Sequence, residues 1–261
     1  MTDEAWPLGC VALKVLDLTA EVEFYQRLGM TLLDRGELDA ALGVPGRILL
    51  RLRQLNQGRP RPPRTAGLYH FAILLPAQAD LSGFLRYGLD GHLPFVGASD
   101  HFVSQALYLQ DPEGNGIEVY ADRPRENWTW SNGSLDIGTA QLDLSHLMEL
   151  SDQASRRLPD GAVLGHMHLN VANLDASQRY YESLGMRLMA DAGWARFLSW
   201  NGYHHHLAVN LLEGRMAGPV QPDVSGVESF AICGKAPASR RVLDPDGVGV
   251  TTSAATCLAQ A

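Results

Sequence analysis

Residues 10–32, CVALKVLDLTAEVEFYQRLGMTL, and residues 166–188, HMHLNVANLDASQRYYESLGMRL, align without a gap at an offset of 156 residues. Each segment begins with the alternating apolar residues of a strand and continues with the spacing of an amphipathic helix. Each ends in Leu-Gly-Met, where Gly29 and Gly185 suit the left-handed residue that closes a helix. A match of this length predicts an internal duplication.

A fainter repeat divides each half again. GLYHFAILLP from residue 67 resembles GVESFAICG from residue 226, and the turn DPEGNG resembles DPDGVG. The chain therefore holds four strand–helix–strands units. The last unit is truncated, because 15 residues separate its first strand from its turn, against 41 in the second unit. We predict two halves, 8–122 and 163–253, joined by a linker at 123–162.

The stretch from residue 100 to residue 120, DHFVSQALYLQDPEGNGIEVY, reads as a β-hairpin. Pro, Gly and Asn in DPEGNG favour a tight turn between two strands of alternating apolar residues. The spacing of His101, Tyr108 and Glu118 resembles the signature of extradiol ring-cleaving dioxygenases, with one departure upstream at Ser99. In that family the Glu is an iron ligand, and the His and Tyr face the bound catechol.

Nearly the whole chain resembles the vicinal oxygen chelate superfamily, which includes glyoxalases, bleomycin resistance proteins and extradiol dioxygenases. The stretches most like bacterial catechol 2,3-dioxygenases are the hairpin, YHFAILLP, LGHMHLNV and GYHHHLAVN. The resemblance implies an α+β fold of repeated βαβββ modules, four here with the last truncated, that form two half-barrel cups. In this superfamily the first and last strands of paired modules point residues into a cup around a metal.

Two pairings of the units are open. Pairing units one and two would place Cys10 and a leucine beside His70 and Glu118, whereas pairing units two and three would place His166 and His206 there. The second set contains three histidines and a carboxylate, and so it includes the two-histidine, one-carboxylate donor set of non-haem Fe(II) oxygenases. A soft thiolate does not suit a site that handles oxygen, so we favour the second pairing.

The resemblance implies that His70, Glu118 and His166 hold the metal. His168 lies on the same strand face as His166 and is an alternative ligand. Fe(II) is the expected ion, with Mn(II), Ni(II) or Zn(II) as alternatives.

Three catalytic residues are expected beside the metal. By the resemblance, His101 and Tyr108 would hydrogen-bond the oxygens of the substrate. Strand alternation places His204 and His206 on one face and His205 on the other, and His206 lines up with the inward position of the superfamily. His206 is therefore expected to be a fourth ligand or an acid–base residue.

The leading hypothesis is extradiol cleavage of a catechol-like aromatic diol by dioxygen. A second hypothesis keeps the fold and assigns a glyoxalase-type isomerase or lyase that uses nickel or zinc with His206 bound. A third is a non-catalytic protein that binds a small aromatic compound, which the truncated last unit and Cys10 in a histidine position suggest.

The composition indicates which binding partners and which cellular location to expect. The net charge is −8 with no basic stripe, which argues against a nucleic-acid partner. No apolar run reaches the length of a membrane span, and the first residues do not resemble a signal peptide. Three widely separated cysteines favour reduced thiols in the cytoplasm. A homo-oligomer is compatible with the sequence.

Overall fold

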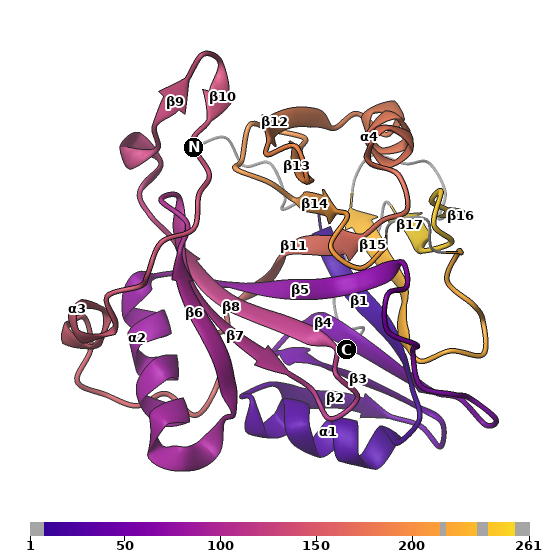
Figure 1. Cartoon of the computed structure of the whole chain (residues 1–261). Coiled ribbons are helices and arrows are strands. Elements are labelled where there is room, and N and C mark those ends of the chain that lie inside the picture. The colour runs from indigo at the N-terminus through magenta and orange to yellow at the C-terminus, as the bar shows by residue number, and fades with distance from the viewer. Residues whose placement is uncertain (1–7, 215–217, 234–239, 254–261) are drawn as a thin grey trace.

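The computed structural model describes residues 8–214, 218–233 and 240–253. The fold consists of two large open sheets with helices packed against them (Figure 1). The larger sheet has eight strands in the order β12-β13-β14-β11-β5-β8-β7-β6. These strands are β5 (Gly67–Leu75), β6 (Phe95–Asp100), β7 (Ser104–Gln110), β8 (Gly116–Asp122), β11 (Val163–Asn170), β12 (Arg187–Asp191), β13 (Ala195–Ser199) and β14 (Leu207–Asn210). The central strand β5 is apolar along most of its length because both of its faces are covered.

The second large sheet has seven strands in the order β16-β17-β15-β1-β4-β3-β2. They are β1 (Leu8–Val15), β2 (Thr31–Arg35), β3 (Asp39–Val44), β4 (Arg47–Gln54), β15 (Gly226–Cys233), β16 (Arg240–Leu243) and β17 (Gly249–Ser253). The truncated last unit thus supplies three strands, and residues 234–239, which connect β15 to β16, lie outside the described residues.

Each large sheet combines two of the four units. Strand β11 of the third unit pairs antiparallel with β5 of the second, and β15 of the fourth pairs antiparallel with β1 of the first. The predicted pairing of units two and three is therefore confirmed, as is the α+β class with two cup-like open sheets. One apolar core packs between the sheets and helices.

The described residues form four α-helices, and the two that belong to the long repeat end at the predicted glycines. The four helices are α1 (Leu18–Arg27), α2 (Gln78–Tyr87), α3 (Leu144–Glu149) and α4 (Leu174–Ser183), with short helical turns at Gly88–His92 and Arg125–Asn127. Asp17 and Asn173, at equivalent positions in the repeat, cap α1 and α4 by accepting from backbone N–H groups of the first turn. Gly29 and Gly185 follow these helices with φ of 110° and 91°, as expected for closing residues. No helix among the described residues is long and apolar enough to cross a membrane.

A buried hydrogen bond fastens each of these repeat helices to the turn of the next unit. The Tyr25 hydroxyl donates to Asp111 at 2.8 Å, and the equivalent Tyr181 donates to Asp244 at 2.7 Å. Both aspartates also accept from backbone N–H groups of their own turns. They therefore order the hairpins and dock the helices, and each is the first residue of its turn, DPEGNG or DPDGVG.

The linker, residues 123–162, contacts both ends of the strand order of the eight-stranded sheet. Its small hairpin consists of β9 (Trp130–Ser131) and β10 (Ser134–Leu135). Ala140 pairs with Asp100 at the end of β6, while the Ser134 hydroxyl donates to the carbonyl of Met189 on β12. Because β6 and β12 are the two edges of this sheet, the linker contacts both edges.

Candidate active site

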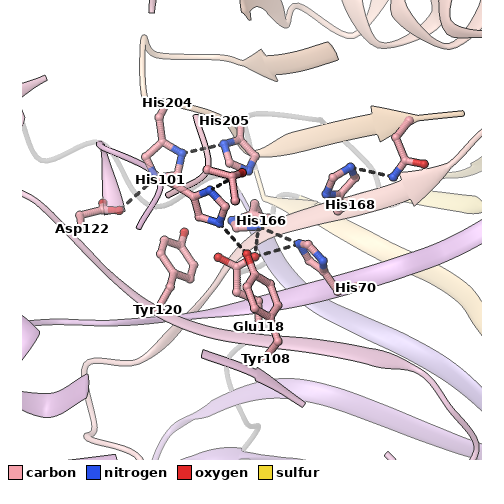
Figure 2. A network of polar contacts seen from close by, with 12 residues as sticks. His70, His101, Tyr108, Glu118, Tyr120, Asp122, His166, His168, His204 and His205 are labelled. Atoms are coloured by element: carbon pink, nitrogen blue, oxygen red, sulfur yellow. Dashed lines mark hydrogen bonds and ion pairs between the residues drawn. The ribbon is translucent and has the colours of Figure 1, made fainter. Parts of the chain in front are cut away.

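Three neighbouring strands of the eight-stranded sheet bring two histidines and a glutamate together. His166 on β11 and Glu118 on β8 both lie beside Ala72 on β5, the strand between them. His70 precedes Ala72 by two residues and therefore lies on the same face of β5. The three side chains converge on this face of the sheet (Figure 2).

The three candidate ligand atoms form a compact triangle. Glu118 Oε2 lies 2.9 Å from His70 Nε2 and 3.3 Å from His166 Nε2, and the two Nε2 atoms are 3.3 Å apart. Nitrogen and oxygen ligands bind a divalent ion such as zinc at about 2.1 Å, so two ligands at right angles lie about 3.0 Å apart. The triangle thus matches one face of a coordination shell, and its donors are those of a 2-His-1-carboxylate centre. These residues fit a divalent metal ion.

The electrostatics of the triangle also suit a metal. Burial by itself would raise the pKa of Glu118, but the interactions with His166 and then His70 outweigh burial and hold this pKa well below its ordinary value. Burial lowers the pKa of His166 to about 4 against the opposing attraction of Glu118. At neutral pH the site therefore presents a carboxylate and a neutral His166 imidazole, the forms that bind metal ions.

His101 and Tyr108 form a hydrogen-bonded pair beside the triangle. The carbonyl of Gly138 in the linker lies 2.7 Å from His101 Nδ1 and can only accept, so the proton is on Nδ1. His101 Nε2 then accepts from the Tyr108 hydroxyl at 2.5 Å. Burial raises the pKa of Tyr108, which keeps this hydroxyl protonated. The following residue, Phe102, has φ of 70°, a strained conformation of the kind that is concentrated at functional sites.

The structure corrects the expectation for the three consecutive histidines. Strand β14 begins only after them, so the predicted alternation does not apply and His204 and His206 do not share a strand face. His205 lines the pocket, with its ring centroid 4.2 Å from that of His166. His206 is buried away from the triangle, and its Nδ1 lies 3.0 Å from the Ser199 hydroxyl. The expected fourth ligand or acid–base residue is therefore not at the pocket, and its neighbour His205 is.

A chain of hydrogen bonds orients His205. Asp122 Oδ1 lies 3.0 Å from His204 Nε2, and His204 Nδ1 lies 2.7 Å from His205 Nδ1 (Figure 2). Because the Asp122 carboxylate can only accept, His204 carries its proton on Nε2 and accepts at Nδ1. His205 then donates from Nδ1 and keeps a lone pair on Nε2. The Tyr203 hydroxyl also donates to Asp122, at 3.0 Å, and fixes the carboxylate.

His168 lies in the same pocket but outside the triangle. Its Nε2 accepts a hydrogen bond of 2.9 Å from the Asn210 amide, and its ring packs against those of His70 and Tyr69 at 4.8 and 4.9 Å. Among the described residues, only His70, Glu118 and His166 form a group with metal-ligand geometry. The geometry thus favours His166 over His168 as the ligand.

The pocket above the triangle has a volume of about 440 Å³, which is in the usual range for small-molecule sites. One wall comes from β6, β7 and linker residues 137–139, and the opposite wall comes from the β12–β13 hairpin. Both edges of the eight-stranded sheet therefore border one cavity, which shows that the sheet curves into a cup. The walls also contain Gly138, Trp194 and Phe197, which the sequence did not predict as site residues because no motif marks them.

The second large sheet has no equivalent centre among its described residues. Cys10, which the repeat aligns with His166, is buried in a small apolar cluster with Ala41, Ile48 and Ala231. This environment agrees with the choice of units two and three, and not one and two, for the candidate metal site.

A family model and a relative of known name match the chain. Residues 8–119 match the family model of the Glyoxalase/Bleomycin resistance protein/Dioxygenase superfamily. The catechol-2,3-dioxygenase of Bacillus subtilis (strain 168) is 37% identical over 233 residues, which are 86% of this chain and 81% of that protein.

Two solved structures share the fold at low identity. The cppA protein from Streptococcus pneumoniae TIGR4 superposes with a TM-score of 0.60 and 12% identity, over 95% of this chain and 98% of that one. Glyoxalase I from Zea mays superposes with a TM-score of 0.57 and 16% identity, over 94% of this chain and 91% of that one.

Proposed function

Because the chain belongs to the glyoxalase/bleomycin resistance protein/dioxygenase superfamily, we propose that it is a metal-dependent extradiol dioxygenase that cleaves the ring of a catechol-like diol. The observation that carries this proposal is the triangle of His70, Glu118 and His166 at the base of an open pocket. A face of three protein ligands leaves the positions on the pocket side available to a diol and to dioxygen. The identity to the catechol-2,3-dioxygenase of Bacillus subtilis supports the same reaction.

His70, Glu118 and His166 would hold Fe(II), the ion proposed from the resemblance, with Mn(II) as the alternative. When bound, the ion supplies a Lewis acid that lowers the pKa of the diol and brings it together with dioxygen. The remaining residues act on the substrate through hydrogen bonds. The Tyr108 hydroxyl lies at one side of the triangle beside His101, and by turning from His101 Nε2 toward the substrate it can donate to negative charge that develops on the ring oxygens.

We assign the acid–base role to His205 and not to His206. His205 lines the pocket next to His166, whereas His206 packs behind it against Ser199. The lone pair that the His204 contact leaves on His205 Nε2 suits a group that accepts a proton from the diol. The glyoxalase-type alternative has less support, because it relied on His206 as a fourth ligand.

The test is reconstitution of the metal-free protein with Fe(II) under anaerobic conditions, followed by oxygen and a panel of catechols. We expect oxygen consumption that matches the formation of a yellow ring-fission product. A Glu118→Gln variant carried through the same loading step is the control. Protein that binds stoichiometric Fe(II) and yet consumes no oxygen with any catechol would contradict the proposal and support the binding-protein hypothesis.

A further inference from the structure

An aromatic wall faces the candidate ligands across the pocket. It is formed by Trp194 and Phe197 of the β12–β13 hairpin, together with Ala192. The Phe197 ring lies 5.1 Å from the ring of His205 and 6.4 Å from that of His168. Trp194 is 51% exposed although it borders the cavity, so apolar surface stands open beside the triangle. A ligand with an apolar group could cover this surface, which favours binding.

The wall is held in place by the backbone of the hairpin. The carbonyl of Trp194 accepts from the N–H of Leu211, and the carbonyl of Ala195 accepts from the N–H of Ala192, at 3.1 and 2.9 Å. Gly193 has φ of 80° and donates its N–H to the Asp191 carboxylate at 2.7 Å. The backbone that carries the aromatic side chains is therefore ordered before a ligand arrives, which reduces the entropic cost of binding.

Arg196 of the β12–β13 hairpin does not line the pocket. Arg196 directly precedes Phe197 on β13, and strand alternation turns its side chain to the face opposite that of Phe197. There it forms ion pairs of 2.7 Å with Asp175 and 3.2 Å with Asp191. Among the described residues that line the pocket there is no lysine or arginine, and the single carboxylate is Glu118 of the triangle. An anionic group on a ligand would find no cationic side chain there.

We propose that the substrate is an uncharged catechol that carries an apolar ring substituent, and that Trp194 and Phe197 select for it. This inference rests on the proposed dioxygenase function, because that function places the diol at the triangle and its substituents toward the remaining walls. A carboxylate attached directly to the ring would lie in the pocket without a cationic partner. Breaking or omitting the partner of a buried charge weakens an interaction by about 10²–10³-fold.

The test compares two catechols that carry either a methyl group or a carboxylate at the same ring position. One is a methylcatechol and the other is the corresponding dihydroxybenzoate. Their dissociation constants are measured by calorimetry on protein loaded with Zn(II), which has no redox chemistry and so prevents turnover. We expect the methylcatechol to bind at least about 100-fold more tightly. The kcat/KM values of the Fe(II)-loaded enzyme should show the same order.

Variants of the wall provide the decisive comparison. Trp194→Arg places a cation at the wall, and we expect it to reduce the preference for the methylcatechol by about tenfold or more. The ratio between variant and parent cancels the effect of the carboxylate on the acidity of the diol. Trp194→Ala should weaken a phenylcatechol by roughly tenfold relative to unsubstituted catechol. Trp130→Arg is the matched control, because Trp130 is 52% exposed and lies outside the pocket.

The outcomes separate this inference from the function on which it rests. Equal affinity for the two ligands, or an unchanged preference in Trp194→Arg, would overturn the inference while a cleaved catechol still supported the dioxygenase. Zn(II)-loaded protein that bound neither ligand would overturn both.

Discussion

Replacement of His205 and of His206 by alanine distinguishes two neighbouring residues that the sequence ranked in the opposite order. His205 lines the pocket and is absent from the metal-ligand triangle. We therefore expect His205→Ala to bind Fe(II) as the parent does and to lose turnover. An acid–base residue typically contributes about 10²–10⁴-fold to the rate, which sets the expected loss in kcat.

The expected effect of His206→Ala is on stability. The change removes the contact between His206 Nδ1 and the Ser199 hydroxyl, worth about 1 kcal/mol. It also removes a ring that packs 5.5 Å from Trp200 and 5.0 Å from Tyr203 in a fully buried position. Truncation of a buried ring to alanine costs about 3–5 kcal/mol, and the small imidazole belongs at the low end. A total of about 3–4 kcal/mol corresponds to a melting temperature roughly 10 °C lower.

The assay measures bound iron, the melting temperature and kcat per bound iron, at a temperature where both variants are folded. The expected pattern is a slow, stable His205→Ala and an unstable His206→Ala whose folded, iron-loaded fraction turns over near the parent rate. If His206→Ala instead lost turnover with its stability intact, while His205→Ala was unaffected, the geometric assignment of the acid–base residue would be wrong.

The remaining predictions concern the metal, the substrate contact and pH. Glu118→Gln should weaken Fe(II) binding by more than about 100-fold, because changes to residues that only hydrogen-bond the metal ligands already cost about 10–100-fold. Cys10→Ala should bind iron normally. Equilibrium dialysis with a competing chelator measures both affinities. Tyr108→Phe keeps the ring and removes only the hydroxyl, so iron content should be unchanged while kcat falls by about 10²–10³-fold, and a parent-like kcat on the true substrate would refute its role. Burial, with the neighbouring acidic groups, raises the pKa of Glu21 from near 4.5 to about 9. Between these pH values the folded state keeps Glu21 protonated and the unfolded state does not, so the free energy of unfolding decreases as the pH rises from about 4.5 to about 9. The difference in melting temperature between Glu21→Gln and the parent should therefore increase from pH 5 to pH 9. Glu23→Gln is the control, because Glu23 is exposed on the same helix. The same increase in Glu23→Gln would show that burial is not the cause.

The repeat and the hairpin signature determined much of this protein from sequence alone. Local periodicity places His70, Glu118 and His166 within strands, and the duplication specifies which strands are equivalent. The poor fit of Cys10 to an oxygen-handling metal then pointed to the pairing of units two and three that the sheet order confirms. These properties depend on residue type and short-range spacing, which a sequence records directly.

Only the tertiary structure decided which side chains reach the pocket. His205 and not His206 faces it because the backbone before β14 is irregular, and the alternation rule holds only within a strand. Gly138 fixes the tautomer of His101 across 37 residues of chain, and Trp194 lines the same pocket as the triangle because the sheet curves until its two edges share one cavity. Sheet curvature and loop paths arise from packing between residues distant in sequence, so no local pattern encodes them.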